Sequence, residues 1–168
     1  SGFSDFVNAD PDFLYRYLSQ HEILYRRHDH PPVFTCEEAA LHCPDLVDIN
    51  TKNLFLRDRK GKRHFLVVTH HHKSVDLKAL GESIGTKLSF GSPERLRKHL
   101  GVEPGSVTVL ALINDSEGKV ELFLDEDVRE AGEVACHPLV NTSTLVLSQA
   151  ELQKFLNSTG HAPNMLSV

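Results

Sequence analysis

The sequence predicts an α+β fold in which a curled, mixed or mostly antiparallel β-sheet is flanked by helices. Helical and strand-like patterns intermingle along the chain, without the regular strand-helix-strand repeat that builds a doubly wound sheet. Apolar runs of strand length are joined by short turns that contain glycine, which favours antiparallel neighbours. The chain has 168 residues and 40 % hydrophobic content, enough for one core, so residues 1–168 are expected to form a single domain. The opening Ser1-Gly2 is read as a remnant of tag removal.

The first fifty residues carry two helix signals and two strand signals. Asp10-Pro11 combines a capping side chain with a proline suited to the first helical position, and apolar residues then share one face. Residues 23–27 form a short strand candidate, which His30-Pro31-Pro32 ends because proline cannot donate to a ladder. A capping box predicts a short helix over 35–42, and residues 46–49 alternate like a strand edge.

The middle of the chain predicts a hairpin followed by two helices. Residues 53–57 and 64–69 are apolar strands, and Gly61 in the turn between them can adopt the positive φ angle that a tight turn demands. Asp76 caps a helix that runs towards Ile84. Ser92-Pro93-Glu94 starts another helix, which ends at Gly101.

The last third predicts a second hairpin, two further strands and a capped final helix. The carboxylates of Asp125-Glu126-Asp127 are interpreted as a charged helix start. A polar tail follows Gly160. The expected elements are strands at 107–113 and 119–124, strands at 133–136 and 142–147, and a helix that begins with the capping pair Ser148 and Glu151.

Composition excludes several classes of protein. A formal net charge of -5 argues against a protein whose main task is to coat nucleic acid, since that task relies on many Lys and Arg. Basic clusters at 57–63 and 95–98 form either solvated surface or a phosphate-facing patch. No apolar run is long enough for a membrane helix, and no phosphate-cradling glycine motif is present, so a membrane partner, DNA and a nucleotide cofactor are not expected. Three cysteines, odd in number and sparse, favour a cytoplasmic location.

Metal binding and nucleophilic catalysis receive little support from spacing. In a strand, His70, His71 and His72 would point to alternate faces, so they are interpreted as loop histidines and no metal is predicted. Cys36 and Cys43 lack further ligands and are interpreted as packing residues. Cys136 and His137 are adjacent, which directs their side chains apart and disfavours a cysteine nucleophile.

Three polar segments embedded in apolar sequence are the candidates for one shared pocket. Lys52 is at the start of an apolar strand. Burial of an ammonium group there removes its hydration, which costs free energy unless a partner binds the charge. The loop 101–106 contains two glycines around Pro104, so its amides can face a ligand, or it is a helix stop followed by a tight turn. The third segment is His137-Pro-Leu-Val-Asn-Thr142.

In combination and order, these segments resemble the YbaK and prolyl-tRNA-synthetase-associated editing domains, and within them the free-standing alanyl-tRNA(Pro) deacylases. The resemblance spans nearly the whole chain. It rests on Lys52-Asn-Leu-Phe-Leu-Arg-Asp58, Val75-Asp-Leu-Lys78, Leu88-Ser-Phe90, Ser92-Pro-Glu-Arg95, Leu100-Gly-Val-x-Pro-Gly-Ser-Val107, Ile113-Asn-Asp115, His137-Pro-Leu-Val-Asn-Thr142 and Phe155-Leu-x-x-Thr-Gly-His161.

The resemblance implies a curled, barrel-like mixed sheet flanked by helices, and hydrolysis of the ester that links alanine to the terminal adenosine of tRNA(Pro). It implies that Lys52 holds the tRNA end, that the glycine-proline loop borders the catalytic pocket, and that residues 137–142 line the aminoacyl side. The resulting candidates are Lys52, Gly101 and His137 as catalytic residues, with Asn53, Pro104, Gly105, Ser106, Asn141 and Thr142 binding substrate.

The implied partners are the acceptor end of tRNA(Pro) and prolyl-tRNA synthetase, and no cofactor is implied. A positioned water and backbone amides would cleave the activated ester without a covalent nucleophile. Two alternatives stay open: a non-catalytic tRNA- or synthetase-binding module of the same fold, and a deacylase that prefers another small aminoacyl group, cysteine or serine.

Overall fold

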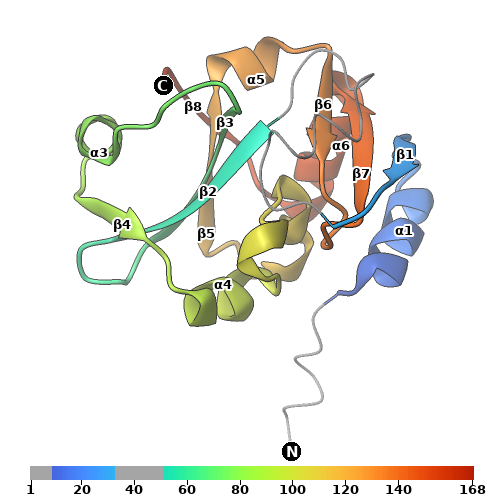
Figure 1. The fold of residues 1–168 in the computed structure, drawn as a ribbon, viewed down its shortest axis with the longest axis horizontal. Helices are drawn as coiled ribbons and strands as arrows, with labels where there is room; N and C mark the ends of the chain where they lie inside the picture. The colour runs from blue at the N-terminus through green and yellow to red at the C-terminus, as the bar shows by residue number, and fades with distance from the viewer. Residues whose placement is uncertain (1–8, 33–50) are drawn as a thin grey trace, which may run out of the picture.

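The computed structural model describes residues 9–32 and 51–168, and in them two β-sheets are surrounded by helices (Figure 1). One sheet has the order β1-β7-β6 and is antiparallel, with β1 at Arg26–Asp29, β6 at Glu133–Cys136 and β7 at Ser143–Ser148. The other has the order β4-β2-β3-β5-β8, with β4 at Leu88–Phe90, β2 at Thr51–Asp58, β3 at His64–His70, β5 at Val120–Asp125 and β8 at Asn164–Leu166. This sheet is mixed, since β5 runs parallel to both β3 and β8. The predicted α+β class with a mixed sheet is confirmed.

Side chains that accept hydrogen bonds from the first turn start most of the helices, as the sequence predicted. The Asp10 carboxylate accepts the amide of Phe13 at 2.8 Å, and Asp76, Ser92 and Ser148 cap their helices in the same way. The helices are α1 (Pro11–Gln20), α3 (Leu77–Ile84), α4 (Pro93–Leu100), α5 (Glu126–Glu130) and α6 (Gln149–Thr159).

The predicted hairpin of β2 and β3 is confirmed, and it is longer than predicted: β2 also includes Thr51, Lys52 and Asp58, and β3 also includes His70. Thr51 pairs with His70 and Lys52 with Thr69, so the start of β2 lies beside the end of β3. Gly61 has φ +68 in the connecting turn, the positive value that the turn was expected to need.

The predicted second hairpin is wrong. Residues Val109–Asn114 form a 3₁₀ helix, η3, in place of a strand, and only Val120–Asp125 is extended. The side chains from Val109 to Leu112 are all buried, so this apolar run has no polar face. Periodicity cannot separate a buried strand from a buried helix in so short a run. The Thr108 hydroxyl, which accepts the amide of Leu110, stabilises the helical alternative.

Two other boundaries differ from the expectation. The first strand lies at Arg26–Asp29 and not at 23–27, because Ile23 is buried in the core before the strand begins. The expected polar tail contains the short strand β8 and the buried His161, whose Nε2 lies 2.8 Å from a carboxylate oxygen of Asp115. The predicted helix at 35–42 and strand at 46–49 lie outside the described residues.

The main hydrophobic core lies between the two sheets. Phe55, Leu66 and Val68 contribute to it from the five-stranded sheet, while Leu145 and Leu147 contribute from the three-stranded sheet. A smaller cluster on the opposite face of the five-stranded sheet includes Leu56, Phe65, Val67, Leu80 and Leu88, where α3 packs. Figure 1 shows α6 behind β6 and β7, which it contacts.

Candidate active site

Lys52 is the second residue of β2 and its side chain is half-buried. Its Nζ donates to the backbone carbonyl of Lys73 at 2.5 Å, and that carbonyl is its one hydrogen-bond partner among the described residues. A lysine ammonium carries three donors. The structure therefore holds this charge in place and leaves donors available to an anionic or polar ligand.

The carbonyl that holds Lys52 belongs to a residue that is itself anchored. Lys73 Nζ lies 2.6 Å from Asp125 and 3.0 Å from Asp127, and only 1 % of the Asp125 side chain is exposed. The hydroxyl of Thr69 donates to the same Asp125 oxygen at 2.6 Å. Sequence reasoning did not single out Lys73, because nothing in its local pattern marks a backbone carbonyl as a ligand.

Asn53 and Lys52 make their contacts in different directions, as neighbouring positions of a strand do. Asn53 Nδ2 donates to the hydroxyl of Thr51 at 3.4 Å, and Thr51 donates to the carbonyl of Ala135 at 2.9 Å. The Asn53 Oδ1 atom is buried without a hydrogen-bond partner among the described residues. Because a buried unpaired acceptor is costly, this oxygen is a further candidate contact for a ligand.

The hydrogen bond from Thr51 to Ala135 joins the start of β2 to β6, and His137 directly follows the end of β6. Figure 1 shows the two strand ends near each other. His137 Nδ1 lies 3.1 Å from the carbonyl of Ser143. A carbonyl oxygen only accepts, so Nδ1 carries the proton and Nε2 is left as a base. Burial lowers the pKa of His137 and outweighs the hydrogen bond to Ser143, which raises it; nearby His30 adds to the lowering, so the neutral ring is favoured.

The rest of this loop is shaped by one unusual backbone conformation. Leu139 has φ 70, a region that side chains other than glycine seldom adopt, and its side chain is buried. Asn141 is half-buried and Thr142 is exposed, while the Thr142 carbonyl accepts the amide of His30 at 2.9 Å. The turn is therefore fixed by packing and by the hydrogen bond from His30, the residue that follows β1.

The glycine-proline loop ends a helix and then forms a tight turn, which is the second of the two expected alternatives. The segment after this turn is a 3₁₀ helix and not the expected strand. Gly101 ends α4 with φ 67, and its amide donates to the carbonyls of Leu96 and Arg97. Pro104–Ser106 form the short 3₁₀ helix η2, in which the Ser106 amide donates to the Glu103 carbonyl. The amides of Gly101 and Ser106 are thus engaged within the protein.

Cys136 does not have the properties of a nucleophile, as the sequence predicted. Its side chain is buried, and burial raises the pKa of the thiol to about 12. Only the thiolate is reactive, so the thiol is inert near neutral pH. Cys36 and Cys43 lie outside the described residues.

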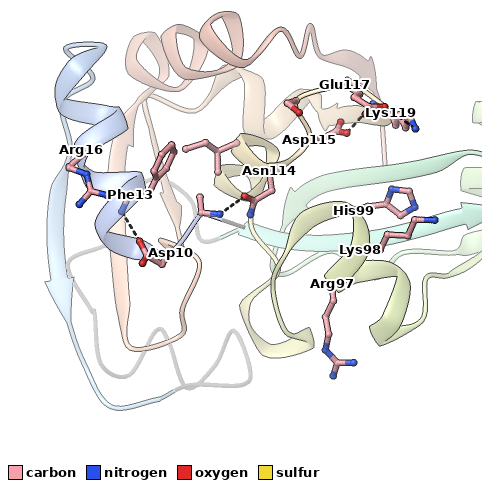
Figure 2. Close-up of a pocket in the computed structure, with 13 residues that line it drawn as sticks. Asp10, Phe13, Arg16, Arg97, Lys98, His99, Asn114, Asp115, Glu117 and Lys119 are labelled. Carbon is pink, nitrogen blue, oxygen red and sulfur yellow. Dashed lines mark hydrogen bonds and ion pairs between the residues drawn. The ribbon is translucent and has the colours of Figure 1, made fainter. Parts of the chain in front are cut away.

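Two cavities lie away from the predicted site. One cavity of about 900 Å³ is lined by Asp10 and Phe13 at the start of α1, Lys98 and His99 of α4, and Asn114 at the end of η3, among others (Figure 2). An adjoining cavity of about 520 Å³ shares Lys98 and His99. None of the predicted site residues lines either cavity. The shared pocket of Lys52, His137 and the glycine-proline loop stays a prediction.

Several arginines of the basic clusters are engaged in contacts within the protein. Arg63 forms a two-bond pair with Glu121 at 2.8 and 2.9 Å, and Arg97 forms a similar pair with Glu103. Arg95 donates to the Gly61 carbonyl at 2.9 Å and lies 3.0 Å from His64 Nε2. Burial, followed by the charges of the groups nearby, lowers the pKa of His64 to about 4, so this ring is a neutral acceptor for the guanidinium. Within residues 9–32 and 51–168, no helix is both long and apolar enough to cross a bilayer.

The sequence matches the family model of the aminoacyl-tRNA editing domain over residues 30–155, and the chain belongs to this family. The resemblance to the YbaK-like editing domains is thereby confirmed, and the chain is of the hydrolase class that edits aminoacyl-tRNA. The matched range includes Lys52, the glycine-proline loop and residues 137–142.

Several curated proteins are similar over most of the chain. The prolyl-tRNA editing protein ProX of Acetoanaerobium sticklandii is 41 % identical over 145 residues, which cover 86 % of this chain and 88 % of that protein. Prolyl-tRNA synthetase associated domain-containing protein 1 of Danio rerio is 39 % identical over 142 residues, covering 83 % and 77 % of the two chains.

Solved structures share the fold at low sequence identity. A protein described as a proposed trans-editing enzyme for prolyl tRNA synthetase superposes with a TM-score of 0.72 at 20 % identity, covering 96 % of this chain and 99 % of that one. The hypothetical protein APE2540 gives a TM-score of 0.70, also at 20 % identity, covering 89 % of this chain and 95 % of that one.

Proposed function

We propose that this protein is a trans-editing deacylase that hydrolyses the aminoacyl ester of mischarged Ala-tRNA(Pro). The observation that carries the proposal is the Lys52 ammonium, which one backbone carbonyl holds at the mouth of β2 while its other donors have no described partner. Family membership and the similarity to ProX support a tRNA(Pro) substrate. We propose further that residues 1–168 act as one editing domain in the cytoplasm.

Lys52 acts through charge and not as a nucleophile. An ammonium donates to phosphate or ribose oxygens, and its attraction to phosphate is stronger at a half-buried position than in bulk water. The carbonyl of Lys73 directs the ammonium, so the terminal nucleotide is gripped in one orientation. Fixing the ester against the reacting water supplies much of the rate enhancement that an activated ester needs.

His137 is the candidate acceptor for the proton of that water or of the neighbouring ribose hydroxyl. The Ser143 carbonyl fixes its tautomer, so Nε2 can receive a hydrogen bond. Burial keeps the ring neutral and therefore able to accept a proton at neutral pH.

The glycine-proline loop contributes differently from the role first expected of Gly101. The Gly101 amide ends α4, so we assign Gly101 to positioning the loop and not to oxyanion binding. Between Pro104, which has no amide hydrogen, and Ser106, whose amide is engaged, Gly105 is the candidate donor to the developing oxyanion. Pro104 and Ser106 then border the bound ester.

Selection of alanine over proline is proposed to depend on the size of the acyl pocket. Asn141 and Thr142 would line the aminoacyl side and Asn53 Oδ1 would accept from the substrate. A missing methylene lowers affinity by only about 1–3 kcal/mol. Steric exclusion of the larger proline therefore gives more selectivity than tighter binding of alanine would. The same pocket would also admit serine or cysteine unless polar contacts exclude them.

The test is release of amino acid from a panel of Ala-, Ser-, Cys- and Pro-tRNA(Pro). We expect fast release of alanine and slow release of proline. Release of alanine no faster than in buffer would overturn the assignment, and tRNA binding without turnover would favour the non-catalytic module. Faster release of serine or cysteine than of alanine would reassign the substrate within the same activity.

Lys52→Met keeps the aliphatic chain and removes the charge, so it tests the lysine directly. We expect loss of most deacylation with unchanged thermal stability. Lys87→Met, at an exposed position, is the matched control and should retain wild-type rates. Wild-type turnover in Lys52→Met would remove Lys52 from the site. Pull-down with prolyl-tRNA synthetase tests the proposed partner separately.

A further inference from the structure

Three consecutive histidines come together where β3 ends. His70, His71 and His72, here called the histidine turn, were interpreted as loop histidines. β3 ends at His70 and the chain turns at the next two residues, so the three side chains do not alternate between the faces of a strand. Their candidate ligand nitrogens all lie within 4.8 Å of one another. The ring centroids of His71 and His72 are 3.8 Å apart, and those of His70 and His71 are 4.9 Å apart.

The backbone of the histidine turn is held at both ends. His70 pairs with Thr51 in the β2–β3 ladder, and its carbonyl accepts the amide of Lys73 at 3.0 Å. At the other end, the Lys73 carbonyl accepts Lys52 and the Lys73 ammonium pairs with the buried Asp125. Three imidazoles thus project from a fixed turn, which lowers the entropic cost of gathering them around a ligand.

Hydrogen bonding within the turn already involves one of the ring nitrogens. His70 Nδ1 accepts the amide of His72 at 3.1 Å, so coordination of a metal ion by this atom would replace that hydrogen bond.

We propose that the histidine turn binds one divalent transition-metal ion of the zinc type through the imidazoles of His70, His71 and His72. Imidazole suits Zn²⁺, Ni²⁺ and Cu²⁺, whereas Mg²⁺ and Ca²⁺ prefer oxygen ligands. With Zn–N distances of about 2.0–2.1 Å, tetrahedral ligand atoms lie ~3.4 Å apart. The present spread of up to 4.8 Å therefore has to close by about 1.4 Å, and the three side chains are exposed or half-buried.

Such a site would be coupled to the candidate active site. The carbonyl that holds Lys52 belongs to Lys73, the residue that follows His72. A metal ion bound at the histidine turn would therefore act on the same backbone segment that positions the Lys52 ammonium. The proposal itself concerns metal binding, and it stands whether or not the deacylase assignment is correct.

The test is calorimetric titration of tag-free protein with ZnCl₂ and, separately, with MgCl₂ at pH 7.5. We expect one Zn²⁺ per chain and no response to Mg²⁺. The variant with all three histidines changed to Ala should lose this binding. Changing the exposed His72 alone should weaken it at least ~10-fold. His21→Ala, an exposed histidine at the end of α1, should bind as the wild type does.

Circular dichroism verifies that each variant is folded. The absorption spectrum of the Co²⁺-loaded protein separates imidazole from cysteine ligation, because thiolate ligands add intense near-ultraviolet charge-transfer bands. A spectrum without those bands supports the histidine turn. Absence of Zn²⁺ binding in the wild type, wild-type binding in the triple variant, or thiolate bands in the Co²⁺ spectrum would each overturn the proposal.

Discussion

Removing the Lys73 ammonium while keeping its carbon chain, in Lys73→Met, should lower the free energy of unfolding by ~2 kcal/mol at neutral pH. The carboxylate of Asp125 is 1 % exposed and loses a partner at 2.6 Å. Breaking a fully buried pair costs about 3–5 kcal/mol. We reduce this figure because 26 % of the Lys73 side chain is exposed, and because Thr69 still donates to Asp125 at 2.6 Å.

Urea denaturation measures the effect. With a slope of about 2 kcal/mol per molar urea, the midpoint should fall by ~1 M. Lys119→Met is the matched control: its pair with Glu117 has side chains that are 65 % and 70 % exposed, so the midpoint should not change measurably.

The difference should depend on pH in a defined direction. Burial alone would raise the pKa of Asp125, but the hydrogen bonds from Lys73 and Thr69 outweigh it and hold the pKa below the ordinary 3.8. On acidification, Asp125 is therefore protonated at a higher pH in the unfolded chain than in the folded protein. The stabilisation by the Lys73–Asp125 pair is complete at pH values above the ordinary carboxyl pKa. It is lost as the pH falls through the lower pKa of Asp125 in the folded protein. Equal midpoints at pH 7, or a difference that does not shrink in acid, would refute the reasoning.

Three further outcomes follow from buried groups and backbone angles. His161→Ala should cost about 1–3 kcal/mol in urea denaturation, because it removes the side-chain partner at 2.8 Å from the buried Asp115 carboxylate and leaves that group only the amides of Lys119 and Val120; an unchanged midpoint would contradict this. Gly61→Ala should lower the melting temperature more than Gly118→Ala does. Both glycines have positive φ, but an added Cβ would meet a guanidinium nitrogen at 2.6 Å only at Gly61, so equal shifts would show that contact to be unimportant. Native Cys136 should resist alkylation at pH 8 in peptide mapping and react in urea, because burial raises its pKa to about 12; rapid labelling of the folded protein would contradict its burial.

Local signals predicted most of the elements that they mark directly. Asp10, Asp76, Ser92 and Ser148 each accept a first-turn amide, because a capping interaction depends on a few neighbouring residues. The β2–β3 hairpin was predictable for the same reason, since its turn joins adjacent segments.

Errors arose where tertiary contacts decide the structure. The run at 109–112 is buried on all sides, so its composition fits a strand and a helix equally, and the surrounding core selects the helix. The segment after Gly160 looks polar, yet β8 pairs with β5 and His161 is buried against Asp115. Neither contact has a signature within the segment itself.

The candidate site was only partly predictable for a similar reason. Lys52 stood out because an ammonium in an apolar strand is unusual. Its partner is a backbone carbonyl, which every residue carries, so Lys73 could not be identified from residue type. The clustering of the histidine turn depends on where β3 ends, and a one-residue change in that boundary alters which way each ring points.

The pairing of β1 with β7 has a consequence for how the chain is made. Arg26 and Val146 are partners although 120 positions separate them in the sequence. At roughly 5–20 residues per second, the ribosome needs about 6–24 s to deliver the second strand after the first. During that interval the early strand lacks β7, the strand it pairs with among the described residues, so a nascent chain stalled before residue 143 should recruit more chaperone than the finished protein does.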